Sequence, residues 1–233
     1  MENFKIELKN LYAQELFEPG RSLAWGHISR FAYPWEALPG IRGLILELGA
    51  GLDESEYDRR GEGVWIHKTA SVAASVHFGS AVIVGAGAQL RHCANIRENA
   101  LIGIGAVVGT ATELKNSILF DGAEVPHYNY VGDSILGYKA HMGAGAITSN
   151  IKSDRTPIIV VCGNERLETG MRKIGAILGD RVEIGCNSVL NPGSVVGAGA
   201  TVYPLSMVRG FVPPSSIYKR QGEVVRKRQA SAG

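Results

Sequence analysis

Apolar residues recur at every sixth position through a long central part of the chain, starting at Ile66. A small or β-branched residue stands two positions before most of them, so each six-residue unit offers two inward-facing candidates. A period of six fits neither an α-helix nor an alternating strand, and it is typical of hexapeptide-repeat β-helices. We therefore predict an all-β fold, a parallel β-helix. The series reads Ile66, Val72, Phe78, Val84, Leu90, Ile96, Ile102, Val108, Leu114 and Phe120.

The six-residue pattern restarts later at Leu136 and Met142, in a shifted frame. Sixteen residues separate Phe120 from Leu136, so we expect the coil to lose two residues between them, in the region of His127. Such irregularities often accompany functional sites, and a neutral deletion is the alternative interpretation. The shifted frame continues through Leu178, Ile184, Leu190, Val196 and Val202.

Three segments depart from the repeat. Residues 1–63 carry apolar residues at roughly helical spacing together with Trp25 and Trp35, and we expect a helical N-terminal cap over the open end of the β-helix. The β-helix itself should span 64–212, with a projecting β-hairpin at 151–173 where Gly163-Asn164 follows an apolar run. After Pro213-Pro214, residues 213–233 should form a basic C-terminal tail with a short helix over 217–229.

Composition excludes several classes of function. A net charge of +2 in 233 residues gives no reason to expect nucleic acid or a membrane surface as partner, so a small ligand is the better expectation. Three cysteines without C-x-x-C spacing, and six histidines without a close pair, argue against a zinc site or a metal-dependent hydratase. The absence of a signal-like apolar stretch favours a cytoplasmic protein.

Two segments carry a family resemblance. His127-Tyr-Asn-Tyr-Val-Gly-Asp-Ser-Ile-Leu-Gly137 and Met142-Gly-Ala-Gly-Ala-Ile-Thr-Ser-Asn150 resemble the acetyltransferase domain of the bifunctional glucosamine-1-phosphate acetyltransferase/N-acetylglucosamine-1-phosphate uridylyltransferase family. The stretch 169–180 is similar to archaeal-type sugar-phosphate nucleotidylyltransferases that carry the same domain. The resemblance implies a left-handed β-helix with three six-residue units per coil, usually a homotrimer that binds acetyl-CoA between subunits.

The resemblance also implies roles for individual residues. His127 matches the catalytic histidine, and no metal is implied for acetyl transfer. Positions that contact the sugar phosphate match Arg97, Lys115, Tyr130 and His141. Positions on the acetyl-CoA side match Ala144, Asn150, Cys186 and Arg220. The chain departs from the family pattern at His141 (Asn in the family), Ile151 (Tyr), Cys186 (Ser) and Pro204 (Ala).

The same residues make chemical sense without the resemblance. Arg97 and Lys115 are eighteen residues apart, so three six-residue units per coil would stack them on neighbouring coils, where two cations favour a dianion such as a sugar phosphate. Neutralisation by Glu98 and Glu113 is the alternative. Histidine titrates near neutral pH, which suits His127 as a general base. Gly143-Ala-Gly145 would let backbone N–H groups approach a thioester oxygen.

These features favour an acetyl-CoA-dependent N-acetyltransferase that acts on an amino-sugar phosphate such as glucosamine 1-phosphate. The alternative is a non-catalytic scaffold or regulatory subunit that binds a sugar nucleotide or a nucleotidyltransferase partner. Nucleotidyl transfer by this chain is not expected, because residues 1–63 hold no Gly-rich phosphate loop and no room for a nucleotide-binding α/β domain.

Overall fold

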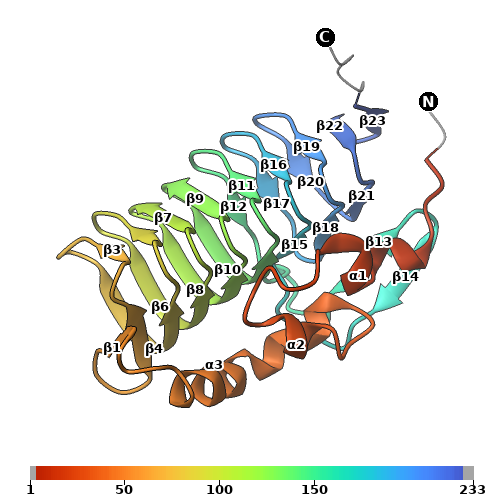
Figure 1. Cartoon of the computed structure of the whole chain (residues 1–233). Helices are drawn as coiled ribbons and strands as arrows, with labels where there is room; N and C mark the ends of the chain where they lie inside the picture. The colour runs from red at the N-terminus through yellow and green to blue at the C-terminus, as the bar shows by residue number, and fades with distance from the viewer. Residues whose placement is uncertain (1–3, 228–233) are drawn as a thin grey trace, which may run out of the picture.

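The computed structural model describes residues 4–227 and has the predicted all-β architecture, a left-handed parallel β-helix with few helices (Figure 1). Each coil crosses three flat faces in the same order, and the strands of one face stack in parallel register from coil to coil. We call the faces face 1, face 2 and face 3. Their strands surround one apolar interior that runs the length of the β-helix.

Four long strands bend at a corner and serve both face 1 and face 2: β4 (His77–Val84), β6 (Asn95–Ile102), β8 (Glu113–Leu119) and β10 (Tyr130–Leu136). Face 1 continues through β12 (Ile147–Thr148), β17 (Val189–Leu190) and β20 (Met207–Val208). Face 2 also holds β2 (Val64–His67), β15 (Ala176–Leu178), β18 (Ser194–Val196) and β21 (Phe211–Val212). Face 3 holds β3 (Ser71–Val72), β5 (Gln89–Leu90), β7 (Val107–Thr110), β9 (Glu124–His127), β11 (His141–Met142), β16 (Glu183–Ile184), β19 (Thr201–Val202) and β22 (Ser216–Arg220).

The two lost residues lie elsewhere than predicted. Ile96 pairs with Leu114, eighteen residues on, but Glu98 pairs with Lys115, seventeen on, so Arg97 bulges out of the ladder and β8 is one residue short. The next coil also advances by seventeen, from Leu114 to Val131. The shortening therefore falls inside β8 and β10 rather than around His127. Its consequence is a step of five residues between inward positions, twice: Leu114 to Leu119 and Val131 to Leu136.

Phe120 is not an inward residue of the β-helix, contrary to the prediction. It stands where the neighbouring coils have Gly103 and Gly137, at the end of face 2. Its side chain is fully buried, but it points outward and packs on Phe17, with 4.8 Å between the ring centroids. Leu119 fills the interior position instead.

The N-terminal segment covers face 2 rather than the open end of the β-helix. Figure 1 shows its helices along one side of the strands, running from the C-terminal coils back to the first coil. The reason is that face 2 presents apolar residues outward, among them Ile83, Leu101 and Ile118, and this surface is buried only if another layer covers it. The helices are η1 (Leu8–Leu11), α1 (Ala13–Leu16), α2 (Trp25–Ile28), η2 (Pro34–Gly40) and α3 (Ile41–Ala50).

The tryptophans follow this lateral arrangement. Trp35 is buried in the layer over face 2, and Trp65 of β2 packs against Gly49 of α3. The N-terminal edge of the β-helix is paired instead by β1 (Tyr57–Arg59), which runs antiparallel to β2. A short antiparallel strand blocks an edge that would otherwise be open to pairing with another chain.

Residues 151–173 leave the coil, but their hairpin does not project from it. Within residues 151–173, β13 (Ile159–Cys162) and β14 (Glu165–Glu168) form an antiparallel hairpin around Gly163-Asn164. Its buried residues Ile158 and Val160 join the layer over face 2, so the hairpin is packed against the coil.

The predicted C-terminal helix is wrong. Residues 217–226 form β22 and β23 (Glu223–Arg226), an antiparallel hairpin stacked on β19, and residues 228–229 of the prediction lie outside the described part. Ladder hydrogen bonds to the preceding coil outweigh the local helical preference of the basic sequence. Tyr218 is buried there and donates a hydrogen bond to Met207 O at 2.8 Å. None of the helices within residues 4–227 has both the length and the apolar character to cross a membrane.

Candidate functional site

His127 lies at the corner between face 3 and face 1. This position is repeated in successive coils, and each time the next residue has a left-handed backbone conformation with positive φ. We call this column the His127 corner. It consists of His92–Cys93, Thr110–Ala111, His127–Tyr128, Ala144–Gly145 and Cys186–Asn187, with Pro204–Leu205 at its C-terminal end.

A buried asparagine holds the backbone of His127. The His127 N–H donates to Asn129 Oδ1 at 3.0 Å, and the Asn129 amide donates to Gly143 O and Ala146 O of the next coil, both at 2.9 Å. Asn129 is 3% exposed, so these bonds are made away from water and fix the corner firmly. The His127 imidazole is exposed and makes no hydrogen bond to residues 4–227.

Of the four residues predicted for the acetyl-CoA side, Ala144, Cys186 and Arg220 lie along the column of His127, whereas Asn150 lies elsewhere, hydrogen-bonded to Asp133. Gly145 N donates to His127 O at 3.0 Å, and Asn187 N donates to Ala144 O at 2.8 Å, so Ala144 and Cys186 occupy the two coils that follow His127. Val202 and Tyr218 pair in register on neighbouring strands. Pro204 lies two residues after Val202 and Arg220 two residues after Tyr218, so the two occupy equivalent positions. Arg220 is highly exposed and pairs with Glu223 at 2.8 Å.

The backbone donors of the Gly143–Gly145 turn are mostly used. Gly143 N donates to Ile184 O at 2.7 Å and Gly145 N donates to His127 O. Ala144 N has no acceptor among residues 4–227, and this N–H is therefore the one in the turn that remains available to a ligand oxygen.

A second polar cluster lies at the corner between face 1 and face 2, where Asn116 and Asp133 have positive φ. We call it the Asp133 corner. Asp133 is 4% exposed, accepts a hydrogen bond from Asn116 Nδ2 at 2.9 Å and from Asn150 Nδ2, and lies 3.5 Å from Lys115 Nζ. A carboxylate this buried is stable as an anion because a cation and two amide donors surround it.

Tyr130 crosses face 1 toward this cluster. Its hydroxyl lies so close to Gly132 that a Cβ there would be 2.5 Å from Oη, which is why a residue without a side chain stands at that position. Burial, and secondly the negative charge of Asp133, raise the pKa of the Tyr130 phenol above its usual value, while a hydrogen bond with Asn150 opposes the shift. Tyr130 and Lys115, which the sequence assigns to the sugar-phosphate side, therefore meet Asn150, which it assigns to the acetyl-CoA side.

Arg97 and Lys115 lie on neighbouring strands but do not stack in register as predicted, because Arg97 bulges out and Glu98 pairs with Lys115. Each of the two cations also has a carboxylate partner. Arg97 Nη1 lies 3.0 Å from Glu113 Oε1, and this hydrogen bond raises the pKa of the guanidinium. Lys115 pairs with Asp133 instead of with Glu98 or Glu113. Face 1 therefore carries less unpaired positive charge than the sequence indicates.

His141 is not brought into either cluster. It lies on face 3, paired in register with Glu124 and Glu183, and its Nδ1 is 3.0 Å from Glu183 Oε2. Ile151 is 42% exposed and lies at the start of the excursion.

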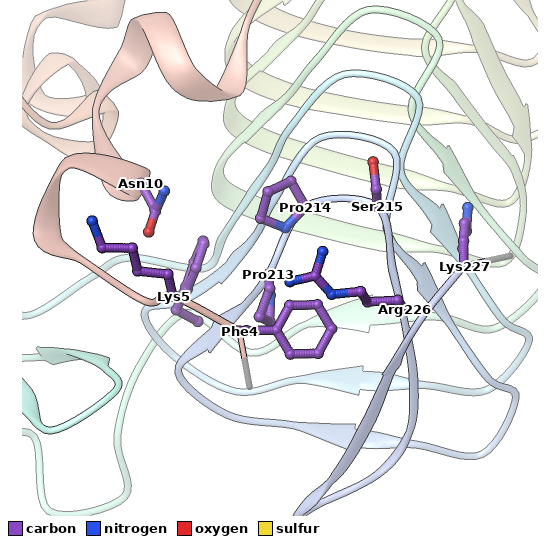
Figure 2. Close-up of a pocket in the computed structure, with 9 residues that line it drawn as sticks. Phe4, Lys5, Asn10, Pro213, Pro214, Ser215, Arg226 and Lys227 are labelled. Atoms are coloured by element: carbon purple, nitrogen blue, oxygen red, sulfur yellow. The ribbon is translucent and has the colours of Figure 1, made fainter. Parts of the chain in front are cut away.

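Two sizeable cavities lie among residues 4–227, of which one adjoins the Asp133 corner. One of about 470 Å³ lies between the excursion and the coil and begins at Ser149 and Ile151, on either side of Asn150. The other, of about 490 Å³, lies between the ends of the described chain and is lined by Phe4, Lys5 and Arg226 (Figure 2). The second cavity adjoins Ser215, at the corner between faces 2 and 3, and is remote from His127.

Sequence reasoning missed Asn129 and Asp133. Asn129 occupies the small inward position held by Ala94 and Thr112 in the preceding coils, so a polar residue in that phase was the available signal. Asp133 had no comparable signal, because its partners Lys115 and Asn150 lie seventeen or more residues away and meet it only through the stacking of coils.

Comparison with known proteins agrees with this fold. A family model described as the GMPPB C-terminal domain matches residues 81–195. A bifunctional sugar-1-phosphate nucleotidylyltransferase/acetyltransferase of Sulfurisphaera tokodaii is 34% identical over 112 residues, 48% of this chain and 28% of that protein. The bifunctional protein GlmU of Methanococcus maripaludis is 33% identical over 137 residues, 58% of this chain and 33% of that protein.

The chain is a homologue of the C-terminal part of GlmU-type proteins. It matches about a third of the length of these GlmU-type relatives. Solved structures are more distant: the acetyltransferase domain of PglB from Neisseria gonorrhoeae, in complex with acetyl coenzyme A, is 18% identical with a TM-score of 0.31, covering 76% of this chain and 60% of that chain.

Proposed function

We propose that this protein is an acetyl-CoA-dependent N-acetyltransferase that acts on an amino-sugar phosphate, with His127 as the general base. The observation that carries the proposal is the His127 corner, where an imidazole without a hydrogen-bond partner in the described chain adjoins the free Ala144 N–H of the next coil. The names of the relatives at 33–34% identity describe bifunctional proteins, one of them an acetyltransferase, which supports the same reaction class.

The proposed reaction uses few groups of this chain. The neutral amine of the sugar attacks the thioester carbon, and a C–N bond forms as His127 takes a proton from the nitrogen. The Ala144 N–H is placed to stabilise the negative charge on the carbonyl oxygen. The C–S bond then breaks, and the CoA sulfur leaves as a thiolate that is protonated from His127 or solvent. Amide product and free CoA thiol account for all atoms.

The donor would lie along the His127 corner toward the C-terminal coils, past Cys186 and Pro204 to Arg220. An exposed guanidinium at the end of this column suits a phosphate of CoA. The acceptor would lie over face 1, where Tyr130, Lys115 and Asn150 meet.

We also propose that the protein works as a homotrimer. Three large apolar side chains are exposed on one coil at the end of the His127 corner: Tyr203 at 42%, Leu205 at 80% and Met207 at 52%. Adjacent exposed apolar residues of this size usually mark an interface, and a second copy that covers them would also enclose the donor column. Sedimentation of the full chain tests this assembly, and a monomer at micromolar concentration contradicts it.

A scaffold without catalysis is the second candidate. It is favoured by Cys186 and Ile151 at positions where the family has Ser and Tyr, and by the carboxylate partners of Arg97 and Lys115. Calorimetry with acetyl-CoA separates the two candidates, because a scaffold of this kind shows no binding at millimolar ligand.

The decisive experiment follows thiol release from acetyl-CoA with glucosamine 1-phosphate as acceptor and identifies the product by mass. The proposal expects an increase of 42 Da in the acceptor, the mass of one acetyl group replacing one hydrogen. Acetyl-CoA binding without transfer to any amino sugar, whether free, phosphorylated or nucleotide-linked, contradicts the proposal. Glucose 1-phosphate, which has no amine, is the matched control acceptor.

A further inference from the structure

The two cations on face 1 are already paired with carboxylates. Arg97 and Lys115, the cations predicted to hold a phosphate, are 3.0 and 3.5 Å from the carboxylates of Glu113 and Asp133. A dianion placed there has to displace or share those carboxylates, and like charge close to it opposes binding. The unpaired cations of the region are found elsewhere.

They line the groove of about 470 Å³ between the excursion and the coil, which we call the excursion groove. Arg166 of β14 and Arg209, which follows β20, both face it and make no ion pair within residues 4–227. Lys152 also lines it but is 3.5 Å from Asp154, the one acidic residue of the described lining. The lining therefore has an excess of two positive charges, both guanidinium groups, which bind phosphate oxygens in bidentate geometry.

The walls of the excursion groove are fixed by backbone packing. Val161 of β13 pairs in register with Arg166, and its carbonyl oxygen would lie 2.9 Å from a Cβ on Gly210, the residue after Arg209. The hairpin thus sits directly on the coil at the point where the two arginines approach the groove. Such contacts hold Arg166 and Arg209 on opposite walls without a ligand, which lowers the entropic cost of binding one.

The excursion groove continues the Asp133 corner. It begins at Ser149 and Ile151, and Asn150 between them donates to Asp133. The His127 corner lies on the other side of face 1. The chain turns at Tyr128, which has positive φ, and then crosses the face from Tyr130 to Asp133, three residues of strand or roughly 10 Å, and the groove begins beyond Asp133. A hexose phosphate is too short to reach from His127 into the groove, whereas a nucleoside diphosphate sugar is long enough.

We infer that the excursion groove binds the diphosphate of a nucleotide-linked amino sugar, with Arg166 and Arg209 as its phosphate ligands. The sugar then lies over Tyr130 and reaches the His127 corner, and the nucleotide lies against the excursion. This assignment rests on the proposed function, and it narrows the amino-sugar phosphate to one whose phosphate is part of a nucleoside diphosphate.

Titration calorimetry of the full chain tests the groove directly, with uridine diphosphate and inorganic pyrophosphate as probes. Both probes should bind, and Arg166→Ala and Arg209→Ala should each weaken binding about 10-fold or more, the usual loss for a hydrogen bond to a charged group. Arg172→Ala is the matched control, because Arg172 is an exposed arginine of the excursion outside the groove lining, and it should leave binding unchanged. Arg209→Lys, which keeps the charge, should lose less than Arg209→Ala.

Three results would overturn the inference. One is binding that none of the arginine substitutions affects, in variants whose thermal unfolding matches the wild type. Another is an equal loss in Arg172→Ala, which indicates general electrostatic attraction. The third is competition between CoA and pyrophosphate with the same dependence on Arg166 and Arg209, because the groove then holds the donor rather than the acceptor.

The calorimetric measurement of diphosphate binding does not depend on acetyl transfer. Arginine-dependent diphosphate binding without acetyl transfer to any amino sugar contradicts the proposed function and leaves an anion site in the groove. Acetyl transfer to glucosamine 1-phosphate that equals transfer to the nucleotide-linked sugar, and does not depend on Arg166 or Arg209, contradicts the groove assignment alone.

Discussion

The first coils of the β-helix, residues 64–112, and its central coils, residues 113–146, use the same positions in different ways. His92 and His127 occupy the same corner, but the His92 ring is hydrogen-bonded to Ser75 Oγ at 2.8 Å whereas the His127 ring has no such partner in the described chain. The small inward position holds Ala94 in the first coils and Asn129 in the central ones.

The corner between faces 1 and 2 changes in the same way. It holds Ala81 and Asn99 in the first coils, and Asn116 and the buried Asp133 in the central coils. The central coils are also one residue shorter, seventeen instead of eighteen. The candidate site therefore arises from polar substitutions at repeat positions, and each buried polar group is tolerated because it hydrogen-bonds to a neighbouring coil.

The largest expected effect separates the two histidines. His127→Ala should reduce acetyl transfer by about 10²- to 10⁴-fold, the range for loss of a general base, whereas His92→Ala should stay within about twofold of wild type. Thiol release under saturating acetyl-CoA measures both variants. Comparable losses in the two would mean that position in the corner, and not proton transfer by His127, is what matters.

Phe120→Ala probes the step of five residues that turns Phe120 outward. Removing a fully buried phenylalanine should lower the free energy of unfolding by about 3–5 kcal/mol, because the layer over face 2 loses its contact with Phe17. Urea denaturation measures the change. Ile104→Ala is a suitable control because Ile104 is 56% exposed, and a similar loss there would show that the assay does not report burial.

The two cations on face 1 should differ in their contribution to stability. Lys115→Met leaves the carboxylate of Asp133 buried without its cation and should cost about 2–3 kcal/mol, less than for a fully enclosed pair because the Lys115 side chain is 15% exposed. Arg97→Met removes an exposed pair with Glu113 and should change the unfolding midpoint little. If Arg97→Met is the more destabilising, the assignment of Lys115 to the buried cluster is wrong.

A smaller effect on stability is expected for the substitution Asp180→Asn, which removes a buried carboxylate outside the central coils. This carboxylate accepts hydrogen bonds from Tyr138 N and Glu18 N, both at 2.7 Å, yet burial raises its pKa above the usual value. A raised folded-state pKa contributes stability that is present below the unfolded pKa and lost as pH rises through the folded value. The melting temperature of wild type relative to Asp180→Asn should therefore fall as pH rises from 4 to 8.

Asp154 provides a control in which the stability should change with pH in the opposite direction. A backbone hydrogen bond from Thr156, chiefly, lowers the pKa of Asp154, so its contribution is present above the unfolded pKa and lost as pH falls. Wild type relative to Asp154→Asn should lose stability toward low pH. If the melting temperature of wild type relative to Asp180→Asn rises with pH instead of falling, burial does not raise the pKa of Asp180 as stated.

Much of the fold and part of the site were accessible to sequence reasoning. The period of six can be recognised from the sequence because each inward residue and each turn recurs within a unit of only six residues. This period predicted the β-helix, and its interruption predicted the excursion at 151–173. The motif around His127 named residues that the structure does stack in one column, since Ala144 and Cys186 follow His127 on consecutive coils.

Other features depended on contacts between distant parts of the chain. The sequence near His127 is compatible with two alternatives: a loss of two residues there, or a loss of one residue in β8 and one in β10. Only the pairing of each strand with the preceding coil shows which residue bulges. The same holds for the N-terminal segment, whose apolar residues fit an end cap or a lateral layer equally well until face 2 shows its own outward apolar residues.

The sequence by itself determined the β-helix architecture through its period of six. The tertiary structure decided which carboxylates Arg97 and Lys115 meet, and it left Arg166 and Arg209 without an ion pair in the described chain. The physical reason is that a period is a property of neighbouring residues, whereas charge pairing depends on the few ångströms between coils that are seventeen or more residues apart in the chain.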